Sequence, residues 1–221
     1  MPDAEDFTRI EALARSLQPG SVGHAYGPWL AARGAGLKDQ AKAALGDFLN
    51  EALTWPEARR RDFVVWLDQA SEQTGARRAI TPHPLMTRLV LPTLWAWAEA
   101  EPADAMAHLL LARFHNWSLD DTSPLDHYRR ALERDAGLVA ARRGVIHALC
   151  DMVERNQHHL PVDYLGDRQR DAASMEEAAS LAEGLPDAAE RQDLIAHAAM
   201  LRDRALGLRS DGGLATYFFA R

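Results

Sequence analysis

The stretch from Pro124 to Asp135 reads PLDHYRRALERD and decides the predicted fold class of this chain. Its apolar and small residues recur three and four positions apart, which places them on one face of a helix. These residues are Leu125, Tyr128, Ala131 and Leu132. Ser123 is a favourable N-cap, and Pro124 suits the first helical turn because its missing N–H would have no partner there. The stretch therefore predicts a short amphipathic helix.

Two further helices are predicted on either side of this one. Residues 103–117 repeat the same apolar spacing, and so do residues 138–156 after a break at residues 135–137. The apolar positions are Met106, Leu109, Leu110 and Phe114 in the first helix and Leu138, Ala141, Val145, Leu149, Met152 and Val153 in the second. We expect Gly137 to take the left-handed conformation that ends a helix, and Asp135 or Gly137 to open the next helix.

The segment 103–156 resembles the tetratricopeptide repeat, a unit of about 34 residues made of two helices. The leucine and the small residue of that repeat's first helix correspond to Leu111 and Ala112. The aromatic residue and the alanine of its second helix correspond to Tyr128 and Ala131. The resemblance covers about one and a half repeats.

The segment also departs from the repeat pattern. Histidines stand at the large and aromatic positions of the first helix, an alanine replaces the proline of the turn, and the loop between the helices is longer. These departures are His108, His115, Ala136 and residues 118–123. The resemblance implies an all-α fold of antiparallel helix pairs stacked as a short α-solenoid. An irregular helical bundle is the alternative.

Helical patterns continue through the rest of the chain. Apolar periodicity predicts helices over residues 7–17, 28–32, 37–53, 56–74, 85–100, 167–183 and 186–208. Pro92 should kink or break one of these helices near Val90, because its ring displaces a backbone hydrogen bond.

We expect these helices to form a single domain over residues 1–221, because no linker divides the chain. All six tryptophans lie in the first 117 residues, so the bulkier core should be N-terminal. The expected parts are a tryptophan-rich half over residues 1–102, a repeat-like half over residues 103–208 and an apolar tail over residues 214–221. The tail either packs back on the helices or mediates association.

Composition and charge narrow the class of protein. The 221 residues carry a net charge of −7, with 47% hydrophobic and 26% charged residues, as in an ordinary soluble protein. The negative charge argues against nucleic acids and anionic membranes as partners and favours basic ones. No signal peptide or membrane-spanning stretch is visible, so we expect a cytoplasmic protein. The scarcity of lysine beside abundant arginine and alanine is typical of a GC-rich bacterial genome.

The sequence contains no recognisable catalytic motif. Phosphate-loop, HExxH, GxSxG and CxxC patterns are all missing, and we expect no cofactor and no metal site. His108 and His115 are two helical turns apart, too far to share one ion. Asp104 lies one turn from His108, and we expect these two residues to pair on the surface. Cys150 is the only cysteine, and we expect a small buried apolar group rather than a nucleophile.

The resemblance to tetratricopeptide repeats also implies a binding surface. In that family the first helix of each pair lines a concave groove, whose exposed residues bind peptides. Carried over by position, the groove residues are Arg113, Asn116, Arg143 and His147. Arginine in a groove suits a carboxylate or an acidic peptide. The alternative is that these side chains form an ordinary solvated helix face.

Three functions are open on this basis. The one we expect is a non-catalytic module that binds a protein or peptide in a helical groove. The second is an immunity- or antitoxin-type protein that neutralises a basic toxin, which the small size and acidic charge suggest. The third is a helical enzyme whose site the sequence does not disclose. The oligomeric state is open as well.

Overall fold

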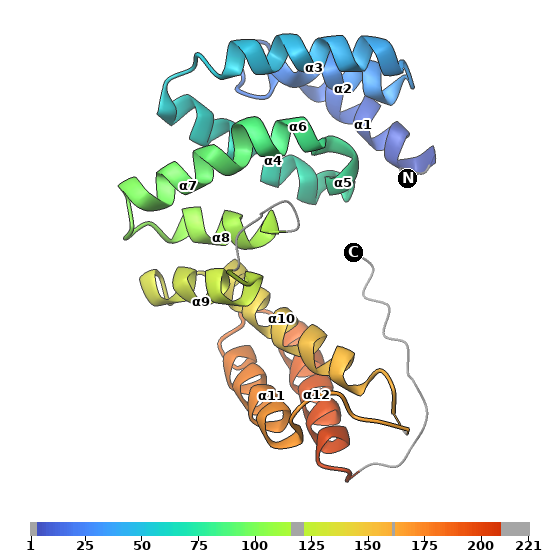
Figure 1. Ribbon diagram of the computed structural model, residues 1–221, viewed down its shortest axis with the longest axis vertical. Helices are drawn as coiled ribbons and strands as arrows, with labels where there is room; N and C mark the ends of the chain where they lie inside the picture. Colours follow the sequence, from blue (N-terminus) through green and yellow to red (C-terminus); the bar gives the residue numbers. More distant parts are fainter. Residues whose placement is uncertain (1–3, 116–121, 161, 209–221) are drawn as a thin grey trace. The chain divides into compact units, whose positions relative to one another are not determined.

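The computed structural model describes residues 4–115, 122–160 and 162–208 (Figure 1). Every regular element within these ranges is a helix, and they contain no strand, so the predicted all-α class is confirmed. Neighbouring helices pack in pairs along the chain, whereas their stacking into a solenoid stays a prediction. No helix in these ranges is both long and apolar enough to cross a lipid bilayer.

The chain divides into two compact units. Of the described residues, the first unit contains 4–102 and 113–115, and the second contains 103–112, 122–160 and 162–208. The predicted border between the two halves, after residue 102, is also a border between the units. The expectation that both halves form one domain stays a prediction. The apolar tail, residues 214–221, lies outside the described residues.

The first unit contains the helices up to α7. They are α1 (Ala4–Ser16), the 3₁₀ helix η1 (His24–Tyr26), α2 (Gly27–Gly34), α3 (Lys38–Ala52), α4 (Glu57–Thr74), α5 (Arg77–Ile80), α6 (His83–Leu85), the π-helix η2 (Met86–Val90) and α7 (Leu91–Ala100). These bounds lie within a few residues of the predicted ones. Helix α4 ends where Gly75 has a φ of 64°, a left-handed conformation that glycine adopts without a steric penalty.

The helix that contains Pro92 does not break near Val90, and the predicted kink there stays a prediction. The π-helix lies directly before α7, and the N–H of Leu91 donates to the carbonyl of Met86, five residues back. Pro92 then stands in the first turn of α7, where it has no hydrogen bond to lose. The hydroxyl of Thr93 donates to the carbonyl of Leu89 at 2.6 Å. The helix therefore widens ahead of the proline instead of ending.

Aromatic side chains fill the core of the first unit. Tyr26 is fully buried, and its ring stacks on Trp29 with the centroids 4.6 Å apart. Phe48 and Phe63 contact the same ring at 4.9 and 5.7 Å. The Tyr26 hydroxyl donates to the carbonyl of Ile80 at 3.0 Å, which ties η1 to α5. The bulky N-terminal core expected from the tryptophans is therefore built around a tyrosine.

The second unit contains the remaining helices. They are α8 (Ala105–Arg113), whose last residue belongs to the first unit, α9 (Pro124–Arg134), α10 (Val139–Gln157), α11 (Arg168–Ala182) and α12 (Ala188–Ala205). The predicted start of α9 is confirmed. The Ser123 side chain accepts from the N–H of Asp126, and the Asp126 carboxylate accepts from the N–H of Ser123. This reciprocal pair is a capping box.

The break between α9 and α10 is present, but its geometry differs from the expectation. Gly137 does not have a positive φ, and the N-cap of α10 is Leu138. The expectations that Gly137 is left-handed and that Asp135 or Gly137 caps the next helix were therefore wrong. The Asp135 carboxylate instead accepts from the N–H of Gly137 at 2.8 Å. Such a side-chain turn closes without left-handed backbone.

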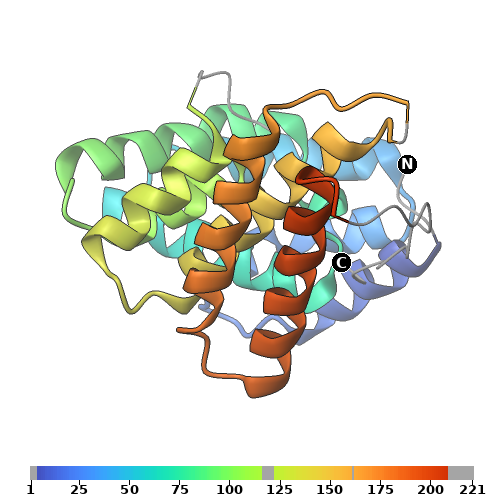
Figure 2. The same cartoon turned by 90° about the horizontal axis from the view of Figure 1, so that it is seen from below.

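In the second unit, helices next to each other in sequence run antiparallel, and alternate helices run in the same direction (Figures 1 and 2). Helices α10 and α12 are joined by three contacts: Arg143 with Glu190, Glu154 with His197, and Gln157 with the carbonyl of Leu201. From the first contact to the third, the residue numbers increase along both helices, so α10 and α12 run parallel. Arg129 of α9 likewise bonds Glu177 of α11 at 2.7 Å. The core lies among α10, α11 and α12 and includes Val145, Leu149, Val153, Met175, Leu194 and Leu201.

Candidate functional site

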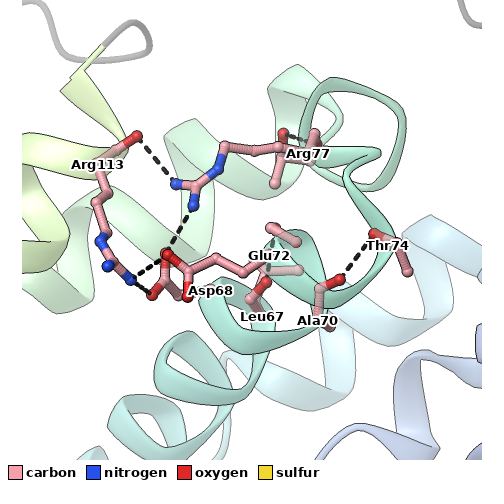
Figure 3. Close-up of polar contacts among 9 residues, drawn as sticks. Leu67, Asp68, Ala70, Glu72, Thr74, Arg77 and Arg113 are labelled. Atoms are coloured by element: carbon pink, nitrogen blue, oxygen red, sulfur yellow. Dashed lines mark hydrogen bonds and ion pairs between the residues drawn. The ribbon is translucent and has the colours of Figure 1, made fainter. Parts of the chain in front are cut away.

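Arg113, the first of the predicted groove residues, is bound by two carboxylates of α4 (Figure 3). Its guanidinium pairs with Asp68 and, at 2.8 Å, with Glu72. Asp68 also accepts from Nη2 of Arg77 at 3.0 Å, and Nη1 of Arg77 donates to the carbonyl of Arg113 at 3.1 Å. The Asp68 side chain is only 6% exposed. One buried carboxylate thus joins two arginines and connects α4, α5 and the end of α8.

This network gives Arg113 a structural role in the first unit. Its side chain is 17% exposed, and a peptide carboxylate would have to displace Asp68 or Glu72 to reach it. Asn116, its predicted neighbour in the groove, lies outside the described residues. The other two groove residues, Arg143 and His147, belong to the second unit.

Arg143 and His147 lie one turn apart on α10, as predicted. The Arg143 guanidinium forms two hydrogen bonds with the Glu190 carboxylate of α12, at 2.5 and 2.7 Å. A bidentate pair of this kind matches the planar fork of arginine to both carboxylate oxygens. Arg143 therefore holds the first turn of α12 against α10, at the edge of the face that carries His147.

Four polar residues outside the predicted groove set continue this face of α10. A shallow pocket of about 460 Å³ is lined by Asp151, Glu154, Arg155 and His158. Counted from His147, they follow at four, seven, eight and eleven residues, which is the spacing of a single helix face. That spacing was visible in the sequence. It could not be distinguished from an ordinary solvated face, because polar residues repeat in the same way there.

Helix α12 orients one of the pocket carboxylates. Nε2 of His197 lies 3.0 Å from Oε1 of Glu154, and the His197 side chain is 10% exposed while that of Glu154 is 49% exposed. The contact comes from the neighbouring parallel helix, so the position of Glu154 depends on the packing of α10 with α12. We call the residues His147, Asp151, Glu154, Arg155 and His158 the α10 face.

Two buried histidines form a separate cluster between α8 and α9. The rings of His108 and His127 stack with their centroids 5.8 Å apart, and the residues are 6% and 1% exposed. The expected pair of Asp104 with His108 does not lie on the surface, because His108 is buried. The Asp104 carboxylate accepts from the N–H of Met106 at 2.8 Å. No sequence pattern indicated that these histidines face each other, because His127 lies on a different helix.

Burial lowers the pKa of His108 to about 4, and the neighbouring Arg134, His127 and Arg130 lower it further while Glu133 opposes them. In an unfolded chain this imidazole titrates near pH 6.5. Between pH 4 and about pH 6.5 this imidazole is protonated in the unfolded state but neutral in the folded state. The stability of the second unit should therefore be intact above about pH 6.5 and decline as the pH falls towards 4.

We predict a loss of about 2 kcal/mol in the free energy of unfolding between pH 7 and pH 5 from His108 alone. Hydrogen exchange of the α8 and α9 amides at the two pH values measures it. His108→Leu should remove most of the difference, whereas His159→Gln, a change at an exposed histidine, should retain it. An equal pH dependence in His108→Leu and the unchanged protein would contradict the assignment.

Among the described residues, two features bear on a possible reaction: the thiol of Cys150 and the placement of side chains that could bind a metal ion. Cys150 is buried as expected, and burial raises the pKa of its thiol to about 12, with Glu154 and Asp151 adding to the effect. A thiol with this pKa carries almost no nucleophilic thiolate near neutral pH. The described residues contain no group of three or more side chains placed to hold a metal ion.

The fold and the α10 face define an all-helical protein of packed antiparallel helix pairs. No protein family, curated protein or solved structure matches this chain.

Proposed function

We propose that this protein is a non-catalytic module that binds a protein or peptide partner through the α10 face of the second unit. The observation that carries the proposal is the parallel pairing of α10 with α12. Contacts at both ends of the shared length, Arg143 with Glu190 and Glu154 with His197, hold the two helices at a fixed separation. A surface that is fixed before binding loses less conformational entropy when a partner docks.

The arrangement of the second unit supports a repeat-like form of this module. In arrays of helix pairs, each repeat packs on its neighbours and the stacked repeats offer an extended concave surface. Helices α10 and α12 run parallel on one side, and α9 and α11 are joined on the other by Arg129 and Glu177. We therefore propose a short tetratricopeptide-like array. The composition supports a bacterial, cytoplasmic setting for it.

An immunity-type protein that neutralises a basic toxin is the second candidate. It is favoured by the two carboxylates of the α10 face, Asp151 and Glu154, together with the net charge of −7. Both candidates use the same face and differ in the size of the partner. A folded toxin would need contacts well beyond one helix, because stable protein interfaces bury roughly 800 Å² on each side.

Selection of a random peptide library against the full chain tests the proposal. We expect enriched peptides whose binding shifts the backbone amide NMR signals of residues 147–158. The double variant His147→Ala, His158→Ala should weaken binding roughly tenfold, as truncation of central interface side chains does. The matched control is Gln169→Ala, Arg170→Ala, two exposed positions on α11. Failure to enrich any peptide, or signals that move only elsewhere, would overturn the proposal.

A further inference from the structure

Four aliphatic side chains are exposed at one end of the second unit. Two belong to the loop between α10 and α11, and two directly follow α12. They are Val162, Leu165, Leu206 and Leu208, which are 91%, 59%, 37% and 70% exposed. A single exposed leucine is ordinary on a protein surface, whereas several at one place are typical of a surface that another segment covers. We call these four residues the α12-end patch.

The guanidinium of Arg168 connects the two halves of this patch. Arg168 begins α11, and its Nη1 donates to the carbonyl of Ala205, the last residue of α12, at 3.0 Å. The same guanidinium lies 4.4 Å from the ring centroid of Tyr164 in the loop. Both contacts are one residue away from a member of the patch, so the loop and the end of α12 share one surface (Figure 1).

Polar contacts, and not the aliphatic side chains of the patch, hold the loop in place. Asp171 of α11 is buried and accepts from the Tyr164 hydroxyl at 2.6 Å and from the Asn156 side-chain amide at 2.8 Å. The N–H of Leu165 donates to the carbonyl of Asn156 at 2.9 Å, which closes the loop onto the end of α10. The loop is therefore fixed while Val162 and Leu165 face water, an arrangement that covering by an apolar segment would stabilise.

We propose that the apolar tail, residues 214–221, covers the α12-end patch of its own chain. The tail reads LATYFFAR and contains three consecutive aromatic residues, Tyr217, Phe218 and Phe219. Only the five residues 209–213 separate Leu208 of the patch from the start of the tail. Five residues span up to about 17 Å, which is enough to bring the aromatic rings back to the patch.

The short connection favours the chain's own tail over the tail of a second copy. A segment joined to its site by a short linker is held there at an effective concentration of roughly millimolar. A second copy competes only when the protein itself is at least that concentrated. Of the two roles expected for the tail, packing within one chain is therefore the one that the structure favours. The proposal uses a surface other than the α10 face and does not depend on the proposed function.

NOE spectra of the full chain test the inference. With labelled methyl groups and labelled aromatic rings, we expect NOEs from the rings of residues 217–219 to the methyl groups of Val162 and Leu165. These NOEs should persist on dilution. They should be missing from a mixture in which half of the chains carry only the methyl label and the other half only the ring label. NOEs in the mixture would assign the patch to a second copy and overturn the inference, as would rings that contact no residue of the patch.

Two sets of variants test the contact from each side. The double variant Val162→Ser, Leu165→Ser keeps the polar contacts of the loop and should shift the backbone amide signals of residues 214–221. The triple variant Tyr217→Ser, Phe218→Ser, Phe219→Ser should make hydrogen exchange of the Leu165 amide roughly threefold faster, because the covered state is no longer favoured.

The matched control is Leu37→Ser, a change at a leucine of the first unit that is 44% exposed. It should leave the signals of residues 214–221 and the exchange of the Leu165 amide unchanged. Unchanged signals from the core among α10, α11 and α12 verify the fold of each variant. The triple variant changes only the tail, so it remains informative if the double variant disturbs the loop. Equal effects of the control and the test variants, or no effect of the triple variant on Leu165, would overturn the inference.

Discussion

Replacing Asp68 with alanine is expected to lower the free energy of unfolding of the first unit by about 3 kcal/mol. The carboxylate is almost fully buried and pairs with Arg77 and Arg113, whose side chains are 29% and 17% exposed. Its removal leaves two poorly solvated guanidinium groups without their shared counter-charge. Arg113 still pairs with Glu72 in this variant. Arg77 still donates to the Arg113 carbonyl and lies 5.1 Å from the Phe114 ring centroid. Because these contacts remain, the expected loss of stability is at the lower end of the range for breaking a buried ion pair.

Urea unfolding followed by tryptophan fluorescence measures this loss, because all six tryptophans lie within the first 117 residues. The matched control is Asp62→Ala, at an exposed aspartate of the same helix, which should change stability by no more than about 0.5 kcal/mol. Asp68→Asn keeps an acceptor oxygen but not the charge, so it should fall between the two. If Asp68→Ala and Asp62→Ala unfold alike, the network does not stabilise the unit.

The parts of the fold that were predictable from sequence are those set by contacts within about one helical turn. The helix face of the opening stretch and the cap at Ser123 both depend on neighbours a few residues away. The break after α9 was placed correctly, but its mechanism was missed. An aspartate and a glycine can each form such a turn, and the choice between them depends on fine backbone geometry.

The contacts that decide the roles of the predicted site residues were not predictable. Asp68 and Arg113 are 45 residues apart, and Arg143 and Glu190 are 47 apart. No local pattern links residues at such separations, because arginines and carboxylates are spread over every helix surface. The sequence could place Arg143 and His147 on one face of α10. It could not show that Arg143 is already paired, or that the pocket lies farther along the same face.

Replacing Gly144 with alanine is expected to destabilise the second unit by about 2 kcal/mol, although alanine stabilises most helix interiors. Gly144 lies within α10, where α9 crosses closely. A Cβ atom there would lie 2.3 to 2.5 Å from three ring carbons of Tyr128, well inside van der Waals contact. To admit a methyl group, either the ring or the whole of α9 has to move.

Gly46 supplies the matched control because it also lies within a helix, α3, but a Cβ there would have no atom within 4 Å. Gly46→Ala should therefore stabilise its unit by about 0.5–1 kcal/mol, the ordinary difference in helix propensity. Hydrogen exchange of the α3 and α10 amides measures both changes. In a Tyr128→Ala background the obstacle is removed, so Gly144→Ala should then stabilise α10 as Gly46→Ala stabilises α3. A stabilising Gly144→Ala in the unchanged protein would mean that α9 and α10 do not pack through this contact.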